Sequence, residues 1–144
     1  MTYHPLGTTG QGTGPLGNSF LPVIYVGIGG FIGAAMRYVA SLATAGWSVV
    51  IPYGTLISNV IGCFVIGVVA ALTADTEALS PNARLFLATG VCGGFTTMSS
   101  FVYELAQYVR SDEMLMAVVY LGLTLAGSIL MFYAGTMLVT VARS

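Results

Sequence analysis

Small and hydroxyl-bearing residues gather in the middle of one long apolar segment of the chain. The segment runs from Asn82 to Val109, and its central stretch, Gly90 to Phe101, reads GVCGGFTTMSSF. Glycine weakens a helix, and Thr and Ser compete for its backbone hydrogen bonds. A break here would free carbonyls that can bind a cation and hydroxyls that can line a polar path, because lipid offers a polar group no partner. The alternative is a continuous helix whose small residues serve close packing. The residues concerned are Gly93, Gly94, Thr96, Thr97, Ser99 and Ser100.

Composition places the chain in a membrane. Of its 144 residues, 56% are hydrophobic and 6% are charged, whereas a soluble domain carries about 25% charged residues. The mean hydropathy is +0.90. A net charge of −1 and the lack of a basic patch argue against nucleic acid as a partner. Cys63 and Cys92 lie in apolar segments and form no metal motif, so we interpret both as small buried residues.

Four apolar segments are long enough to cross a bilayer as helices. The sequence therefore predicts an all-α membrane protein with a four-helix transmembrane domain over residues 20–144. Residues 1–19, rich in Gly, Thr and Pro, are predicted to form a disordered tail. The four segments are Leu21 to Ala45, Tyr53 to Ala74, Asn82 to Val109 and Met114 to Ala142.

The position of the polar stretch predicts a break near the bilayer midplane. Eleven residues, Asn82 to Cys92, precede it, and eleven, Ser99 to Val109, follow it. At about 1.5 Å per residue, each half spans roughly 16 Å, which is about half of the hydrocarbon core. Glu104 lies one turn beyond Phe101, toward the far interface, where we expect its carboxylate in a water-filled vestibule.

Single polar side chains interrupt the first two segments. Arg37 lies in the last third of its segment, where it either extends to the headgroups or turns inward to hold a polar group. Asn59 needs hydrogen-bond partners in hydrocarbon. It either clamps a neighbouring helix or offers its N–H groups to a passing anion.

A stripe of hydroxyl groups runs along one face of the fourth segment. Tyr120, Thr124 and Ser128 are four residues apart and therefore share one helix face. Such a stripe either bonds helices together or forms the wall of a polar conduit.

The segments hold no nucleophile-and-base set, carboxylate pair or phosphate loop, and the single His lies in the tail. The sequence thus predicts a small pore or carrier and not an enzyme.

The arginines divide evenly between the two sides of the membrane. With four spans, Arg84 and Arg143 fall on one side, and Arg37 and Arg110 fall on the other. An excess of Lys and Arg on the cytoplasmic side normally sets the orientation, so this chain is expected to insert both ways. An antiparallel, dual-topology homodimer follows. In it, two midplane breaks face each other, and carbonyls from both chains converge on one cation.

Three stretches, in order along the first three segments, resemble the signature motifs of the Fluc fluoride channel family, also called CrcB. They are GGFIGAAMRY (Gly29 to Tyr38), YGTLISNVIGCFVIG (Tyr53 to Gly67) and GVCGGFTTMSSFVYE (Gly90 to Glu104). The resemblance covers all four segments and leaves out only the tail. It implies a passive fluoride channel in the plasma membrane (in bacteria, the inner membrane). Such a channel works as a dual-topology homodimer and exports fluoride to relieve its toxicity.

The resemblance also implies roles for individual residues. Backbone carbonyls of Gly93 and Thr96 match the positions that hold a buried structural Na⁺ at the centre of the family's dimer. Asn59 matches the pore asparagine, and Arg37 matches the arginine of the first span. These residues would link the helix break to both the ion and the pore.

One pore position departs from the family pattern. The motif that usually reads TTFSTF reads TTMSSF here. Phe101 keeps the second of the two pore phenylalanines, whereas Met98 stands where the first would be. A ring faces an anion with its positive edge, and a thioether has no such edge. The other pore candidates are Thr97, Ser99, Ser100, Tyr120, Thr124 and Ser128, with structural or electrostatic roles for Arg37 and Glu104.

Two other functions compete with a fluoride channel. A small multidrug-type exporter also has four spans and dual topology. It needs an acidic residue in its first span to couple protons, and Leu21 to Ala45 contains no Asp or Glu. The second is a structural membrane subunit without transport of its own. The hydroxyl stripe and the predicted break argue against that alternative.

Overall fold

The computed structural model describes residues 20–48, 50–74 and 78–143. Over these residues the chain forms helices and no strand, and four helical segments are long and apolar enough to cross a membrane. Each begins and ends within one residue of the bounds expected from the sequence. The predicted tail, residues 1–19, lies outside the described residues. The segments are α1 (Phe20–Thr44), α2 (Tyr53–Ala74), the third span (Pro81–Arg110) and α6 (Met114–Arg143).

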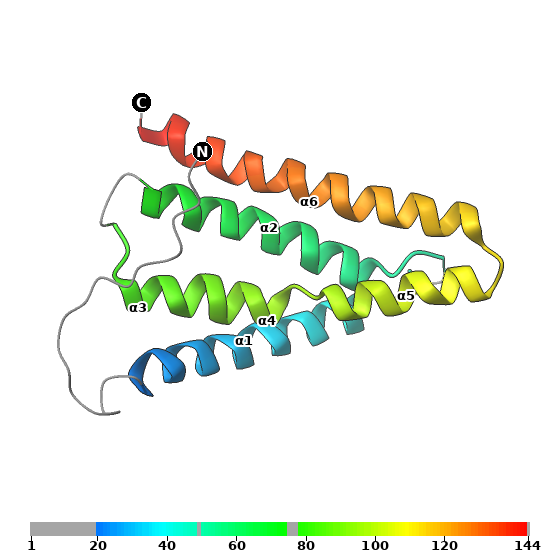
Figure 1. Ribbon diagram of the computed structural model, residues 1–144, viewed down its shortest axis with the longest axis horizontal. Helices are drawn as coiled ribbons and strands as arrows, with labels where there is room; N and C mark the ends of the chain where they lie inside the picture. Colours follow the sequence, from blue (N-terminus) through cyan, green and yellow to red (C-terminus); the bar gives the residue numbers. More distant parts are fainter. Residues whose placement is uncertain (1–19, 49, 75–77, 144) are drawn as a thin grey trace, which may run out of the picture.

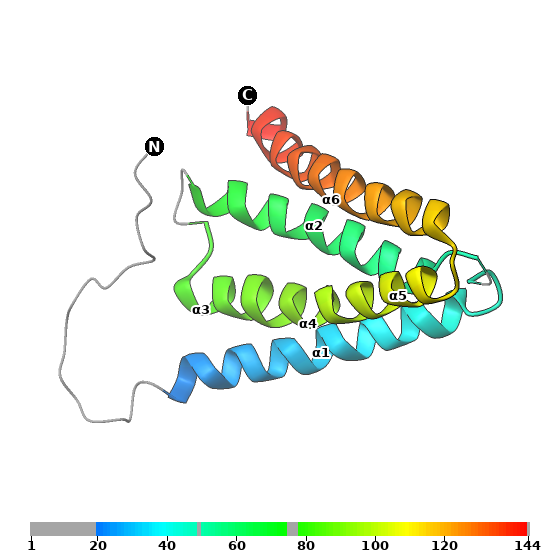
Figure 2. The same cartoon turned by 45° about the vertical axis from the view of Figure 1, so that its right-hand side comes forward.

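The four spans lie side by side and alternate in direction (Figure 1). The helix α2 lies between α6 and the third span, and α1 lies against the third span on the side away from α6 (Figures 1 and 2). The start of α1 and the end of α6 are therefore at the same end of the molecule.

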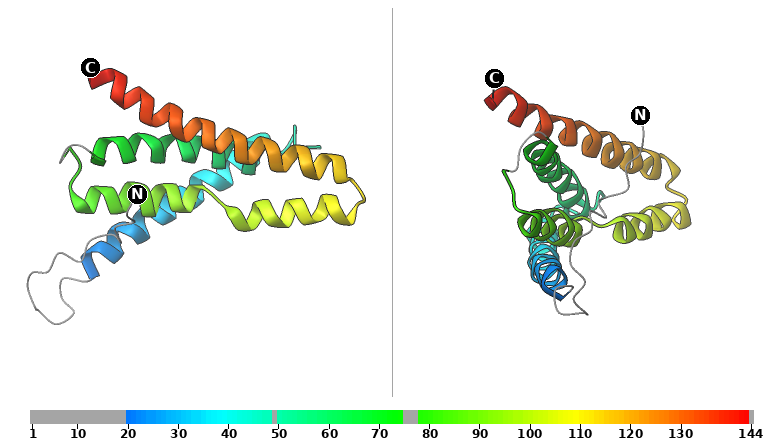
Figure 3. Two further views of the ribbon diagram at one scale, coloured as in Figure 1. Left: turned by 45° about the horizontal axis from the view of Figure 1, so that its top comes forward. Right: turned by 60° about the vertical axis from the view of Figure 1, so that its left-hand side comes forward.

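The third span is broken near its middle. Between its two halves, Thr96 and Thr97 have extended backbone angles, with φ −78° and ψ 155° at the first and φ −151° and ψ 114° at the second. β-Branched residues favour such angles. The predicted break is therefore present, and beyond it the chain turns away from its earlier line (Figure 3). The helical pieces of the span are α3 (Pro81–Arg84), the π-helix η1 (Leu85–Cys92), α4 (Gly93–Phe95) and α5 (Met98–Arg110).

The first half of the span extends further than expected. Gly93 and Gly94 remain helical, so this half ends at Phe95 and not at Cys92. The physical reason lies in the contact with α1, because a side-chain carbon at Gly94 would collide with the Gly30 carbonyl oxygen. Gly94 therefore serves close packing, whereas Gly93 has no such contact, and the two threonines make the break.

Glycines also set the other close contacts between spans. A side-chain carbon at Gly29 or Gly33 of α1 would collide with the backbone of η1. In the contact between α2 and α6, Gly67 and Gly135 have the same role. Small residues let helix backbones approach closely, and in a membrane this packing supplies much of the association. The fold thus consists of two tightly packed pairs of helical segments. One pair is α1 with the first half of the third span, and the other is α2 with α6. The helix α5 extends beyond the first pair.

We expect Gly33→Ala to lower the free energy of unfolding by about 2 kcal/mol, in the range for overpacked cores. The added methyl group would collide with the Val91 carbonyl oxygen. Thermal unfolding in detergent micelles measures the change. Gly27→Ala is the matched control on the same helix, because its methyl group would meet nothing within 4 Å. Equal stability of the two variants would show that α1 does not depend on this backbone contact.

Candidate functional site

Asn59, on the neighbouring helix α2, forms hydrogen bonds with the backbone at the break. Its Nδ2 donates a hydrogen bond to the Thr97 carbonyl oxygen at 3.2 Å, and its Oδ1 accepts one from the Thr97 N–H at 2.7 Å. Asn59 and Thr97 are both only 9% exposed. Of the two roles considered for this amide, the structure shows the first, in which Asn59 clamps a neighbouring span. One N–H of Nδ2 remains outside these two bonds.

The break redirects two backbone N–H groups away from the helix. In a continuous α-helix, the Thr97 N–H would bond to the Gly93 carbonyl, and the Ser100 N–H would bond to the Thr96 carbonyl. Here the first donates to Asn59, and the second donates to the Thr97 hydroxyl at 3.1 Å. The carbonyls of Gly93 and Thr96 thereby lose their helical partners. Gly93 is also exposed at the surface of the single chain.

The Thr97 hydroxyl caps the start of α5. Besides accepting from the Ser100 N–H, its Oγ1 lies 3.1 Å from Ser100 Oγ and 3.2 Å from Ser99 Oγ. A threonine at this position satisfies an N–H that the helix leaves without a partner. The three hydroxyls therefore form one cluster at the beginning of α5.

Arg37 turns inward instead of extending to the headgroups. Its Nε donates a hydrogen bond of 3.1 Å to the Gly94 carbonyl oxygen, one of the last acceptors of the first half-span. Helix ends leave such carbonyls without partners, and a cation beside them is favourable. The inward position also takes Arg37 out of the charge count at the interface. Two arginines then remain at one end, Arg84 and Arg143, and one at the other, Arg110.

We expect Arg37→Leu to lower the free energy of unfolding by about 2 kcal/mol, because it removes a charged donor and leaves a carbonyl unpaired in the membrane. The midpoint of thermal unfolding in detergent checks this. Arg84→Leu deletes the same charge at an exposed position of α3 and should have little effect. If the Arg37 and Arg84 variants unfold at the same temperature, the contact with Gly94 does not stabilise the break.

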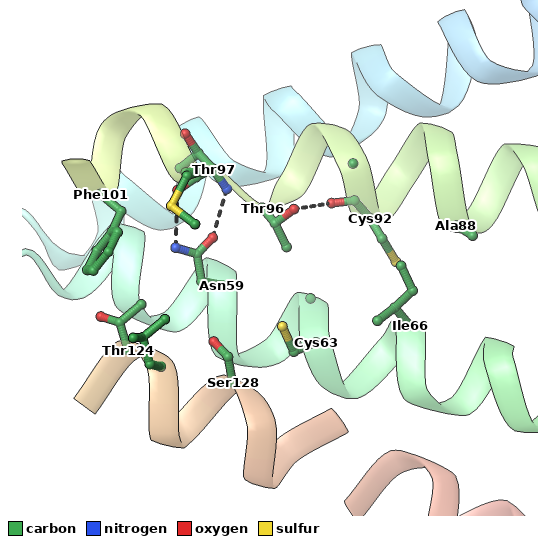
Figure 4. Close-up of a pocket in the computed structure, with 14 residues that line it drawn as sticks. Asn59, Cys63, Ile66, Ala88, Cys92, Thr96, Thr97, Phe101, Thr124 and Ser128 are labelled. Carbon is green, nitrogen blue, oxygen red and sulfur yellow. Dashed lines mark hydrogen bonds between the residues drawn. The ribbon is translucent and has the colours of Figure 1, made fainter. Parts of the chain in front are cut away.

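A cavity of about 330 Å³ lies beside the break, between the third span, α2 and α6. Figure 4 shows polar groups from three spans facing it, with Asn59 on α2, Thr97 at the break, and Thr124 and Ser128 on α6. Thr124 is 4% exposed, and its Oγ1 is buried without a hydrogen-bond partner among the described residues. Such an orphaned hydroxyl is costly unless something binds it. The other lining residues that the sequence selected are Gly93, Thr96, Met98 and Phe101.

A second polar cluster lies one turn further along α5. The Glu104 carboxylate accepts hydrogen bonds from the Thr55 hydroxyl at 2.7 Å and from the Tyr120 hydroxyl at 2.6 Å. Tyr120 is fully buried, and its ring packs at a tilt on the Phe101 ring, with 5.2 Å between the centroids. Glu104 is half-buried and has two protein partners, which the expectation of a carboxylate in a water-filled vestibule did not include. This cluster continues the line of polar groups from the cavity.

The structure brings most of the predicted site residues together but not all in one place. Asn59, Thr97 and Phe101 meet at the cavity, together with Met98, which is 66% exposed at its rim. Ser99 and Ser100 belong to the cap of α5 and not to the cavity wall. Tyr120 belongs to the cluster with Glu104, and Arg37 lies on the opposite side, at the contact with α1. Sequence reasoning missed Thr55, although its spacing of four from Asn59 places both on one face of α2.

Comparison with known proteins finds close relatives of the chain. Residues 24–136 match the family model described as "CrcB-like protein, Camphor Resistance (CrcB)". A protein from Prosthecochloris aestuarii is 41% identical over 122 residues, which cover 85% of this chain and 95% of the relative. One from Chlorobium phaeobacteroides is 44% identical over 113 residues (78% and 88%), and one from Clostridium novyi is 44% identical over 112 residues (74% and 88%). All three are named "Fluoride-specific ion channel FluC".

Proposed function

The chain belongs to the CrcB family, whose relatives above are named fluoride-specific ion channels, and we propose that it conducts fluoride passively across the cell membrane. The protein is a multi-pass membrane protein of an ion-channel family and not of an enzyme family. The membrane potential contributes about 2.3 kcal/mol per charge per 100 mV. With the inside negative, it drives fluoride out of the cell and so relieves its toxicity.

The polar wall of the cavity is the observation that best supports a path for fluoride. Fluoride is small and strongly hydrated, so a pore must replace its water with hydrogen-bond donors. Thr124, with its unpaired hydroxyl, Asn59, with one N–H outside its bonds to Thr97, and Ser128 all line one cavity. We place fluoride in contact with these donors, beside the ring of Phe101. The Glu104 cluster and the hydroxyls at the start of α5 lie further along the same route.

Electrostatics support an anion at this depth. Moving an isolated ion into a low-dielectric medium costs of order 20 kcal/mol before relaxation. Arg37 holds its charge inward at Gly94, and none of the described residues that line the cavity carries a carboxylate. The positive charge of Arg37 and the donors of the cavity wall would together offset this cost. Selection against the larger chloride ion would require a narrow bore along this path.

The freed carbonyls fit a structural Na⁺. Backbone carbonyl oxygens replace the hydration shell of a monovalent cation in ion-selective sites. Gly93 and Thr96 each have a carbonyl whose helical partner donates elsewhere, and Gly93 is exposed and Thr96 half-buried in the single chain. When bound, the ion would supply a fixed positive charge near the fluoride path. Elemental analysis of desalted protein should find sodium, and fluoride efflux should fall after exchange into sodium-free buffer.

We propose that two chains pair in opposite orientations. Polar backbone at membrane depth must be covered by protein, and Gly93 is exposed in the single chain. The small difference in arginine number between the two ends sets no strong orientation. Light scattering in detergent should give twice the chain mass. A cleavable tag at the end of α6 should be accessible from both sides of a vesicle, and access from one side alone would contradict dual topology.

The proposed function is tested by efflux from liposomes that contain the purified protein. A fluoride electrode should record rapid loss of trapped fluoride after the counter-ion pathway is opened with valinomycin. The same vesicles loaded with chloride should lose little of it. Loss of neither ion from folded protein would favour a structural subunit. Efflux that depends on a proton gradient and a cationic drug would favour the multidrug-type exporter.

Met98→Phe restores the family pattern and is expected to conduct within about twofold of the native chain or faster. Met98 is 66% exposed at the rim of the cavity, so a phenyl ring replaces it without collision inside one chain. Substitutions at such surface positions change energies by about 0.5 kcal/mol. The liposome assay measures the rate. A tenfold loss of conduction would show that this pore is built around the thioether.

A further inference from the structure

Three sulfur-bearing side chains line the cavity in addition to its oxygen and nitrogen donors. Cys63 on α2 and Cys92 at the end of η1 are free thiols, and Met98 at the start of α5 adds a thioether. Figure 4 shows the sulfur of Cys63 pointing from α2 toward the third span and the side chain of Cys92 extending back toward α2. The two thiols therefore line the same cavity from two different spans. Fluoride conduction as described above uses neither thiol.

The chemistry of this lining selects one class of ligand. Thiolate and thioether sulfur are soft ligands that favour Cu(I) and similar ions over hard cations. Among the described residues, no Asp, Glu or His lines the cavity, so hard divalent ions find few ligands there. We propose that Cys63 and Cys92 bind a soft monovalent cation, Cu⁺ or its analogue Ag⁺, with Met98 as a further ligand, and that the bound ion blocks the cavity.

Charge balance favours a neutral complex. A metal–sulfur bond forms at one cysteine as its S–H bond breaks, and the proton leaves to water at the open side of the cavity. The Met98 thioether coordinates without losing a proton, and the second cysteine adds only a weak contact while it keeps its proton. The positive charge of the ion and the negative charge of one thiolate then cancel. A neutral complex avoids the large cost of a net charge in a low-dielectric cavity.

Blockage follows from the place of the sulfur atoms. The ion would lie inside the cavity of about 330 Å³ that Asn59 and Thr124 also line. Contacts with both cysteines would in addition tie α2 to the third span beside the break. A cation held in this way leaves fluoride less room and fewer donors. The effect on flux rests on the proposed channel function, whereas the binding of the ion does not.

The test measures binding and flux separately, with Ag⁺ as the probe in chloride-free nitrate medium. Purified native chain, Cys63→Ser, Cys92→Ser and the double variant are incubated with silver nitrate and desalted, and bound silver is counted by elemental analysis. We expect one Ag⁺ per native chain, weaker retention in each single variant and none in the double variant. In liposomes, micromolar Ag⁺ should lower native fluoride efflux at least tenfold, with each variant compared with its own rate without silver.

Each outcome decides a separate point. Equal silver retention by the native chain and a folded double variant would overturn the proposed site. If the double variant fails to fold, protection of both native thiols from maleimide by Ag⁺ gives the same decision. Silver bound without loss of flux would overturn the block and leave the channel function intact. A native chain that conducts no fluoride even without silver contradicts the proposed function, and the binding measurement still decides the site.

Discussion

Asn59→Asp is expected to lower the rate of fluoride efflux by about 100-fold, which corresponds to roughly 2.7 kcal/mol. The amide now donates to the Thr97 carbonyl and accepts from the Thr97 N–H. A carboxylate keeps the acceptor but places a second oxygen against that carbonyl, and it removes the second N–H of the amide. Its negative charge would also repel fluoride. The substitution thus acts on the break and on the ion at once.

Two measurements separate these effects. Fluoride efflux from liposomes gives the loss of conduction, and thermal unfolding in detergent gives the loss of the clamp. Asn82→Asp is the matched control, because it introduces the same charge near the start of α3 and outside the cavity beside the break. Native efflux from the Asn59 variant would remove this residue from the path. If the Asn59 variant has native stability but slow efflux, then conduction of the ion depends on the amide, whereas the stability of the break does not.

Local sequence rules predicted the helices well because a membrane constrains them strongly. A span must satisfy its own backbone, so its length and hydropathy fix its ends to within one residue here. The same rules placed a break in the stretch around Thr96 and Thr97. They did not locate it, because whether a glycine pair bends a helix depends on what packs against it. Gly94 stays helical because the Gly30 carbonyl lies where a side chain would be.

The partners of the polar residues were beyond reach from the sequence alone. Arg37 had two possible positions, and only the packing of α1 on the third span brings its Nε to the Gly94 carbonyl. Thr55 attracted no attention as a single hydroxyl in an apolar segment. It becomes part of the site because the fold places it 2.7 Å from a carboxylate on another span. Spacing identifies a shared face, but a contact between spans is a property of the fold.

The π-helix η1 is a third feature that the sequence did not indicate. Its residues are apolar and carry no periodic signal that separates a π-helix from an α-helix. π-Helical turns are rare and often lie at functional sites. This one ends at Cys92, directly before the piece that carries Gly93. It therefore sets the rotation with which the last turn before the break presents its carbonyls.

Phe101→Ile is expected to lower fluoride efflux by about 50-fold, or roughly 2.3 kcal/mol. The ring is 4% exposed, lines the cavity and packs at a tilt on Tyr120. Aromatic rings carry a positive edge that can face an anion, and pairs of rings gain about 0.5–1.5 kcal/mol beyond their burial. Isoleucine keeps much of the volume but offers neither the edge nor the ring contact. The loss should appear in conduction more than in stability.

The liposome assay compares this variant with Phe31→Ile, which makes the same change on the exposed face of α1, where the ring is 77% exposed. Efflux from the Phe31 variant should equal that of the native chain, which shows that the change of side-chain type is harmless away from the cavity. A second comparison, Phe101→Tyr, retains the ring and should recover most of the rate. If Phe101→Ile conducts as fast as the native chain, then the anion passes the break without an aromatic contact, and the hydroxyls of α6 with Asn59 must suffice to replace its water.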